Sequence, residues 1–222
     1  MYKWLVIVLI AFANAWIWRI FKFNFPLFIL LILLTIILNY LIIRKITRKL
    51  LVFFVILLGI VTFFQWKTTT PQSLTLLDND EQRIKQERLQ YYNPSSHYMR
   101  ILFARLDLKN FLEGDLNIAS TKLQRNFFET IDPNVYFFAG HPRERVWAND
   151  FEKFPFILIA PFLVGLYQII KKKNRFIFSY FLASLILITL IGHKNTMGPF
   201  ILFPLFVICI RYGLLKILKN ET

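Results

Sequence analysis

Six runs of almost uninterrupted apolar residues constrain the fold of this chain more than any other feature of its sequence. Each run approaches the roughly 20 residues with which an α-helix crosses a bilayer. The runs cover residues 4–18, 26–43, 50–66, 155–170, 176–192 and 199–215, and none contains an acidic residue. A soluble protein would need a far larger polar shell to bury six such helices. We therefore expect an all-α, polytopic membrane protein with six transmembrane helices.

One long polar stretch, residues 67–154, separates the third run from the fourth. It holds twelve acidic and twelve basic residues, so its formal charge is zero. The net charge of +14 therefore lies on residues beside the apolar runs. A nucleic-acid-binding protein concentrates positive charge on a folded polar domain, so we expect no nucleic-acid partner. Basic residues next to apolar runs are instead typical of topology signals and lipid-headgroup contacts.

Two basic loops predict the orientation of the chain. Residues 44–49 and residues 171–175 each carry four Lys or Arg residues, and short loops of this kind face the cytoplasm. One apolar run separates each loop from residues 67–154. That stretch is therefore expected outside the cytoplasm, with both chain termini inside and the cell membrane as the location. Fifteen basic residues lie beside the runs; this orientation places twelve of them inside and three, Arg19, Lys22 and Lys194, outside.

The same pattern divides the chain into three parts. Residues 1–66 form a three-helix membrane segment, residues 67–154 an extracytoplasmic helical domain, and residues 155–222 a second three-helix membrane segment with a short cytoplasmic tail. Within the outer domain, helices are expected over about 76–92, 98–113 and 118–130. The aromatic residues 135–140 fit either a core segment or a segment on the bilayer surface.

The start of the chain allows two interpretations. Lys3, the apolar residues that follow it, and Ala13-Asn14-Ala15 fit a signal peptide with a small-residue cleavage site. The apolar run continues through Trp18, which favours an uncleaved first span over loss of residues 1–15. Both interpretations leave the rest of the chain in the same orientation.

Tryptophan and a few polar side chains mark further positions in the runs. All five Trp residues lie at or near an expected span end, where the ring suits the headgroup level. The polar residues inside the runs are expected to form hydrogen bonds between helices; they include Asn14, Thr35, Asn39, Ser184 and Thr189.

The sharpest candidate site is the sequence His141-Pro142-Arg143-Glu144-Arg145, about ten residues before the fourth run. Arg143 and Arg145 can bind a phosphate or carboxylate bidentately, and His141 or Glu144 can carry a proton. A lipid-linked phosphate at the outer leaflet would meet these residues at the right depth. The alternative is an ion-paired turn that anchors the domain to headgroups.

A metal site has little support in the sequence. Asp78-Asn79-Asp80 matches the short Asp-x-Asp pattern of metal-assisted sugar transfer. Acidic residues at the positive end of a helix dipole explain the same pattern without a metal. We expect no cofactor.

The C-terminal membrane part carries several features of one known family. They are Pro155-Phe156 followed by Gly165-Leu166, the basic turn 171–175, and a last run that contains Gly213-Leu214. In these features residues 155–218 resemble the C-terminal membrane part of polyprenyl-phosphate-sugar-dependent glycosyltransferases. That family places a catalytic acidic residue in its first outer loop, and the corresponding residues 19–25 contain none. The resemblance therefore implies a non-catalytic relative or one part of a complex.

Three functions follow from these features. The first is a multi-pass membrane protein whose outer domain binds a protein partner or an envelope lipid and is not catalytic on its own. The second is a membrane enzyme, or a subunit of one, in the assembly of lipid-linked envelope sugars. The third is a transporter component, which the uncharged centres of the runs disfavour. Membrane lipids, a lipid-linked phosphate, and a protein partner or second copy are the expected partners.

Overall fold

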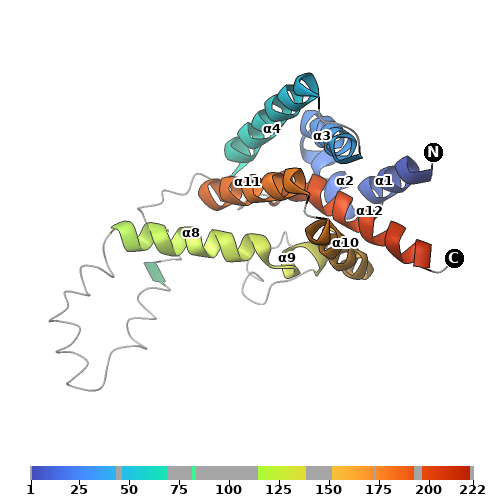
Figure 1. The fold of residues 1–222 in the computed structure, drawn as a ribbon. Coiled ribbons are helices and arrows are strands. Elements are labelled where there is room, and N and C mark those ends of the chain that lie inside the picture. Colours follow the sequence, from blue (N-terminus) through green and yellow to red (C-terminus); the bar gives the residue numbers. More distant parts are fainter. Residues whose placement is uncertain are drawn as a thin grey trace, which may run out of the picture. The chain divides into compact units, whose positions relative to one another are not determined.

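The structure, a computed structural model, describes residues 2–43, 47–69, 82–83, 115–138, 152–172, 174–192 and 197–220. Every regular element in these ranges is helical (Figure 1), so the all-α prediction is confirmed for them. The chain divides into two compact units, one of residues 1–70 with 127–222 and the other of residues 71–126. Residues 127–154 of the polar stretch thus belong to the same unit as the apolar helices.

Among the described residues, the elements from the apolar runs and those from the polar stretch can be given separately. The former are α1 (Tyr2–Phe12), α2 (Ala15–Phe23), α3 (Phe25–Ile43), α4 (Arg48–Thr68), α10 (Ile159–Lys171), α11 (Arg175–Ile191) and α12 (Phe203–Asn220). The latter are α8 (Asp115–Ile131) and α9 (Asn134–Phe137). Short 3-10 turns, η1 (Phe156–Leu158) and η2 (Phe200–Leu202), lead into α10 and α12.

Three helices among the described residues are long and apolar enough to cross a membrane. They are Phe25–Ile43, Arg48–Thr68 and Phe200–Leu218. Two bent pairs raise this number to five if each pair forms one span: Val6–Phe12 with Ala15–Phe23, bent by 63°, and Phe156–Lys171 with Arg175–Ile191, bent by 118°. The structure therefore supports three to five spanning helices, and six spans stay a prediction.

The first apolar run differs from the expected single helix because it breaks at Asn14. The Asn14 Oδ1 accepts a hydrogen bond from the Ile17 amide at 2.9 Å. Its Nδ2 donates to the carbonyl oxygens of Ile10 and Ala11, each at 2.9 Å. One amide thus satisfies backbone groups at the end of α1 and at the start of α2. Asn14 thus forms hydrogen bonds with two helices, α1 and α2. The expected bond between helices was wrong for Thr35, whose hydroxyl donates to Leu31 O within α3.

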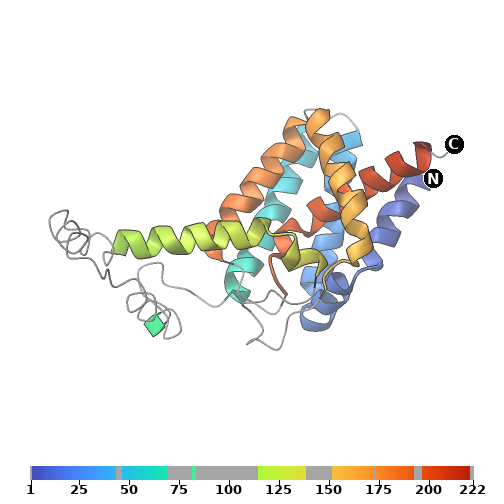
Figure 2. The same ribbon diagram turned by 90° about the horizontal axis from the view of Figure 1, so that it is seen from below.

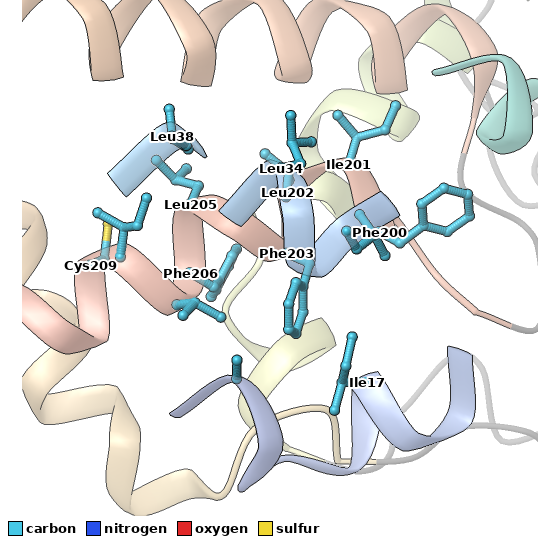
Figure 3. Packing of buried hydrophobic residues seen from close by; sticks show 14 of the residues in the cluster. Ile17, Leu34, Leu38, Phe200, Ile201, Leu202, Phe203, Leu205, Phe206 and Cys209 are labelled. Carbon is cyan, nitrogen blue, oxygen red and sulfur yellow. The ribbon is translucent and has the colours of Figure 1, made fainter. Parts of the chain in front are cut away.

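The core of the larger unit surrounds η2 and the first half of α12, whose side chains are almost completely buried. Figure 3 shows Leu34 and Leu38 of α3 on one side of this segment and Ile17 of α2 on the other. By contrast, α3, α4 and α11 each present large exposed apolar side chains on their outer faces. This distribution suits helices that pack on one side and meet lipid on the other.

Two expectations for the polar stretch are confirmed in part. α8 covers the helix expected at 118–130 and begins three residues earlier. Tyr136 and Phe137 of α9 are buried against the apolar helices, which agrees with the core interpretation for these two residues; residues 139–140 lie outside the described part. Gln82 and Arg83 are helical, within the helix expected at 76–92. The other residues of that helix, and the helix expected at 98–113, lie outside the described residues.

Candidate functional site

The candidate residues chosen from the sequence lie outside the described part of the chain. This holds for His141, Arg143, Glu144 and Arg145, and also for Asp78 and Asp80. Within the described residues, no group of three or more His, Cys, Asp or Glu side chains is arranged to hold a metal ion. The structure does describe the residues on both sides of the segment 139–151. We call residues 135–136 and residues 153–154 the two anchors of this segment.

These two anchors are joined directly by hydrogen bonds. The Lys153 Nζ donates to the carbonyl oxygen of Val135 at 2.6 Å. The Phe154 amide donates to the carbonyl oxygen of Tyr136 at 2.9 Å. Residues 135–136 and residues 153–154, on the two sides of the undescribed segment 139–151, therefore lie side by side.

Lys153 is buried although it carries a charged side chain. Only 4% of its surface is exposed, and its Nζ lies 5.9 Å from the ring centroid of Trp16 and 5.8 Å from that of Tyr136. Ammonium groups over aromatic faces gain cation–π attraction, which is stronger where water is excluded. Gly198 lies against the lysine stem, since a Cβ there would come within 2.7 Å of Lys153 Cε.

Trp16 of α2 connects Lys153 to the segment that contains Met197. Its indole Nε1 donates to the carbonyl oxygen of Met197 at 2.5 Å, and its amide donates to the carbonyl oxygen of Lys153 at 3.3 Å. Trp16 is completely buried within the protein, and its expected position at the headgroup level stays a prediction. We call the set Trp16, Tyr136, Lys153, Phe154, Met197 and Gly198 the lysine junction.

Stacked aromatic rings attach the lysine junction to α12. The centroid of Phe206 lies 4.2 Å from that of Tyr136 and 5.7 Å from that of Phe154. The Phe154 ring also lies nearly parallel to Phe203, at 6.0 Å. Aromatic pairs at these separations stabilise a core beyond the burial of their area. The anchors of the segment 139–151 are thus part of the helical core.

Tyr136 stays protonated in this environment. Burial raises the pKa of its phenol well above the usual value, and the nearby Asp132 carboxylate adds to the rise. The hydroxyl donates to the carbonyl oxygen of Thr130 at 2.7 Å. The neutral phenol is the form that makes this bond, so Tyr136 ties the end of α8 to α9.

Helix ends meet at two places in the larger unit, one near the lysine junction and one elsewhere. Near the lysine junction, Gln65 at the end of α4 donates to the Gly198 carbonyl oxygen at 3.4 Å. Elsewhere, Phe54 near the start of α4 lies 5.4 Å from Phe176 near the start of α11. Figure 2 shows the end of α3 and the starts of α4 and α11 at one end of the larger unit, with α2 and the end of α4 at the other.

Sequence reasoning missed the lysine junction. Tyr136 was noted only as part of an aromatic stretch, and Lys153 only as one of the basic residues of the polar domain. The available signal was the Lys153-Phe154-Pro155 sequence directly before an apolar run. No local pattern indicates that Trp16 and Met197, far apart in the chain, converge on this lysine.

Comparisons with family models, with curated proteins and with solved structures give no match. The resemblance of residues 155–218 to glycosyltransferases therefore stays a prediction.

Proposed function

We propose that this chain is a six-span protein of the cell membrane whose outer domain binds an envelope lipid with an anionic headgroup, and that it does not turn over substrate on its own. In this proposal Arg143 and Arg145 hold the phosphate. The observation that carries it is the closed base of the segment 139–151, formed by Lys153 with Val135 and by Phe154 with Tyr136. This base lies shortly before α10, and in the proposal the two arginines between its ends meet a lipid phosphate near these apolar helices.

The meeting of helix ends supports the alternation of sides in the proposed topology, and the basic loops alone predict which side is cytoplasmic. Gln65 and Gly198, which are in contact, both belong to ends assigned to the outside. Phe54 and Phe176, also in contact, both follow loops assigned to the cytoplasm. The Lys172 ammonium lies 5.4 Å from the ring centroid of Tyr212, and these two residues are also assigned to the cytoplasmic side. If residues were assigned to the wrong sides of the membrane, residues from opposite sides would be found in contact.

Six crossings require α10 and α11 to cross separately and the bent pair α1–α2 to cross once. The helices Phe156–Lys171 and Arg175–Ile191 are each about 25 Å long at 1.5 Å per residue. The hydrocarbon core is about 30 Å thick. Local thinning of the bilayer accommodates a mismatch of this size at modest cost.

Paired substitution of the arginines tests the lipid site. The variant Arg143→Ala with Arg145→Ala is compared with Arg83→Ala with Arg88→Ala, which removes the same charge from the same domain. Binding of a polyprenyl phosphate to each purified protein in detergent micelles is measured by native mass spectrometry. Loss of charge-assisted hydrogen bonds should weaken binding at least about tenfold in the first variant only. Equal affinity of both variants would contradict the lipid site.

An enzyme, or a subunit of one, in lipid-linked sugar assembly is the second candidate. It is favoured by the position of Gly165 and Gly213, two residues that carry the family resemblance, because each lies against the helix of the other. In this candidate His141 or Glu144 carries the proton and the two arginines hold the phosphate. Sugar transfer from a polyprenyl-phosphate sugar by the intact chain, abolished in Glu144→Gln, would favour it over the non-catalytic proposal. If Glu144 instead only docks a partner protein, the intact chain should transfer no sugar. The Glu144→Gln variant should then recover a different amount of the partner protein in a pull-down than the unmodified chain does.

A further inference from the structure

α2 is set at an angle to the helix that precedes it. The chain bends by 63° between α1 and α2, and the Asn14 side chain bonds both sides of the bend. The nine residues of α2 rise only about 14 Å at 1.5 Å per residue. This is less than half of the hydrocarbon thickness, so α2 is an oblique segment at the end of the bundle.

The two faces of α2 have different surroundings. Trp16, Ile17 and Ile20 are fully buried in the core. On the other face, Trp18 and Phe21 are 50% and 41% exposed, and Phe23 is 55% exposed. Lys22 is exposed as well, so this face combines aromatic rings with positive charge. Exposed aromatic rings at a span end are typical of helices that lie in the interfacial layer of a bilayer.

The exposed rings form one continuous group. Phe21 lies 5.8 Å from Trp18, 5.5 Å from Phe25 and 5.2 Å from Phe28, measured between ring centroids. The Trp18 indole also donates to the Phe12 carbonyl oxygen at 2.8 Å. These contacts hold the aromatic face in a fixed shape on the outside of the bundle.

The charges of α2 complement an anionic surface. The helix contains Arg19 and Lys22 and no acidic residue. Lys22 is exposed, and the Arg19 guanidinium lies 5.7 Å from the ring centroid of Phe23. Only three basic residues beside the apolar runs depart from the cytoplasmic bias, and these are two of the three. A role in headgroup binding explains why positive charge occurs here.

We propose that α2 is the oblique outer end of the first crossing, where the chain enters the membrane interface, and that Arg19 and Lys22 bind the phosphate groups of anionic phospholipids, with the aromatic face among the upper acyl chains. This site is separate from Arg143 and Arg145. It rests on the membrane insertion and the predicted orientation of the proposed function but not on its outer-domain ligand.

Quenching of Trp18 fluorescence tests this proposal with the full chain in vesicles. The Trp18 signal is the difference between the protein and its Trp18→Phe variant, with helix content checked by circular dichroism. Two kinds of phosphatidylcholine vesicle are compared. In one, about one lipid in five is a brominated phosphatidylglycerol; in the other, the same fraction is a brominated phosphatidylcholine. Enrichment of anionic lipid around α2 predicts stronger quenching by the brominated phosphatidylglycerol.

Two charge variants complete the test. Arg19→Gln with Lys22→Gln should lower the preference for phosphatidylglycerol, since each charge near an anionic surface changes lipid binding by about fivefold. Arg48→Gln with Lys49→Gln removes the same charge at the start of α4 and should retain the preference. Equal quenching by both lipids in the unmodified protein would overturn the proposal, as would an unchanged preference in the α2 variant. Absence of quenching by either lipid would show that a protein covers α2 and would also overturn it.

Discussion

Gly165 of α10 and Gly213 of α12 lie against each other, backbone to backbone. A Cβ at Gly165 would overlap the carbonyl oxygen of Cys209 and lie 2.9 Å from the amide nitrogen of Gly213. A Cβ at Gly213 would overlap the carbonyl oxygen of Pro161. Small residues let membrane helices approach closely and gain van der Waals contact where no hydrophobic force drives their association. The pair therefore fixes α10 on the central helix.

Alanine at either glycine should separate the two helices. Because the opposing atoms are backbone, they cannot rotate away, and we expect Gly165→Ala or Gly213→Ala to destabilise the protein by about 1–3 kcal/mol. Gly59→Ala is the matched control, since a Cβ at Gly59 meets nothing within 4 Å. It should be neutral or slightly stabilising. Thermal unfolding in detergent measures all three, and equal melting of Gly165→Ala and Gly59→Ala would contradict the close contact.

Lys153 should control the anchors of the segment 139–151. Lys153→Met keeps most of the stem but removes the ammonium that bonds the Val135 carbonyl oxygen. The neighbouring bond from the Phe154 amide to Tyr136 should then open more often, by at least about fivefold if roughly 1 kcal/mol is lost. Hydrogen–deuterium exchange at Phe154 reports this opening. Lys67→Met, at an exposed lysine, should leave the exchange rate unchanged; equal rates in both variants would show that the lysine does not hold the anchor.

Residues 1–15 should remain in the protein recovered from membranes. Ile7 and Ala11 of α1 are each only 2% exposed, and Trp16 is completely buried. Cleavage after Ala15 would remove core residues and expose their partners to lipid. Peptide mapping of the purified protein measures the N-terminus directly, and a chain that starts at Trp16 would show that the signal-peptide interpretation is right.

Tyr136 should make stability depend on alkaline pH. Its pKa is raised in the folded protein by burial and by Asp132, so the folded state keeps the phenol proton when the unfolded state, with a pKa of about 10, loses it. Stability from this group is complete below pH of about 10 and falls as the pH rises further. Compared with Tyr136→Phe, the unmodified protein should be more stable near neutral pH by about 0.5–1.5 kcal/mol and lose that advantage above pH of about 10. A constant difference across this range would contradict a buried, neutral phenol.

The sequence predicted the helical class of the described residues well because apolar runs are a local property. The same runs did not predict the bend at Asn14, since one side-chain amide there competes with continuation of the helix. The hydropathy of each run taken alone also does not indicate that η2 and α12 form the buried centre while α4 stays largely exposed. That distinction depends on which helices surround which.

The lysine junction was beyond sequence reasoning for a related reason. Its members come from four separate segments, and only the fold brings Trp16, Lys153 and Met197 together. A buried lysine beside an apolar run has the same local pattern as a solvated topology signal. The candidate arginines 143 and 145 were found because they are adjacent in sequence, and their role stays a prediction.

The most direct test of the account is the side of the membrane on which residues 67–154 lie. Cys209 is the only cysteine and is buried, so Cys209→Ala provides a background for single cysteines at the exposed positions Gln124 of α8 and Thr47. A membrane-impermeant thiol reagent is added to intact cells. The account predicts labelling of Gln124→Cys at once and of Thr47→Cys only after permeabilisation. Labelling of Thr47→Cys in intact cells, with Gln124→Cys protected, would contradict it.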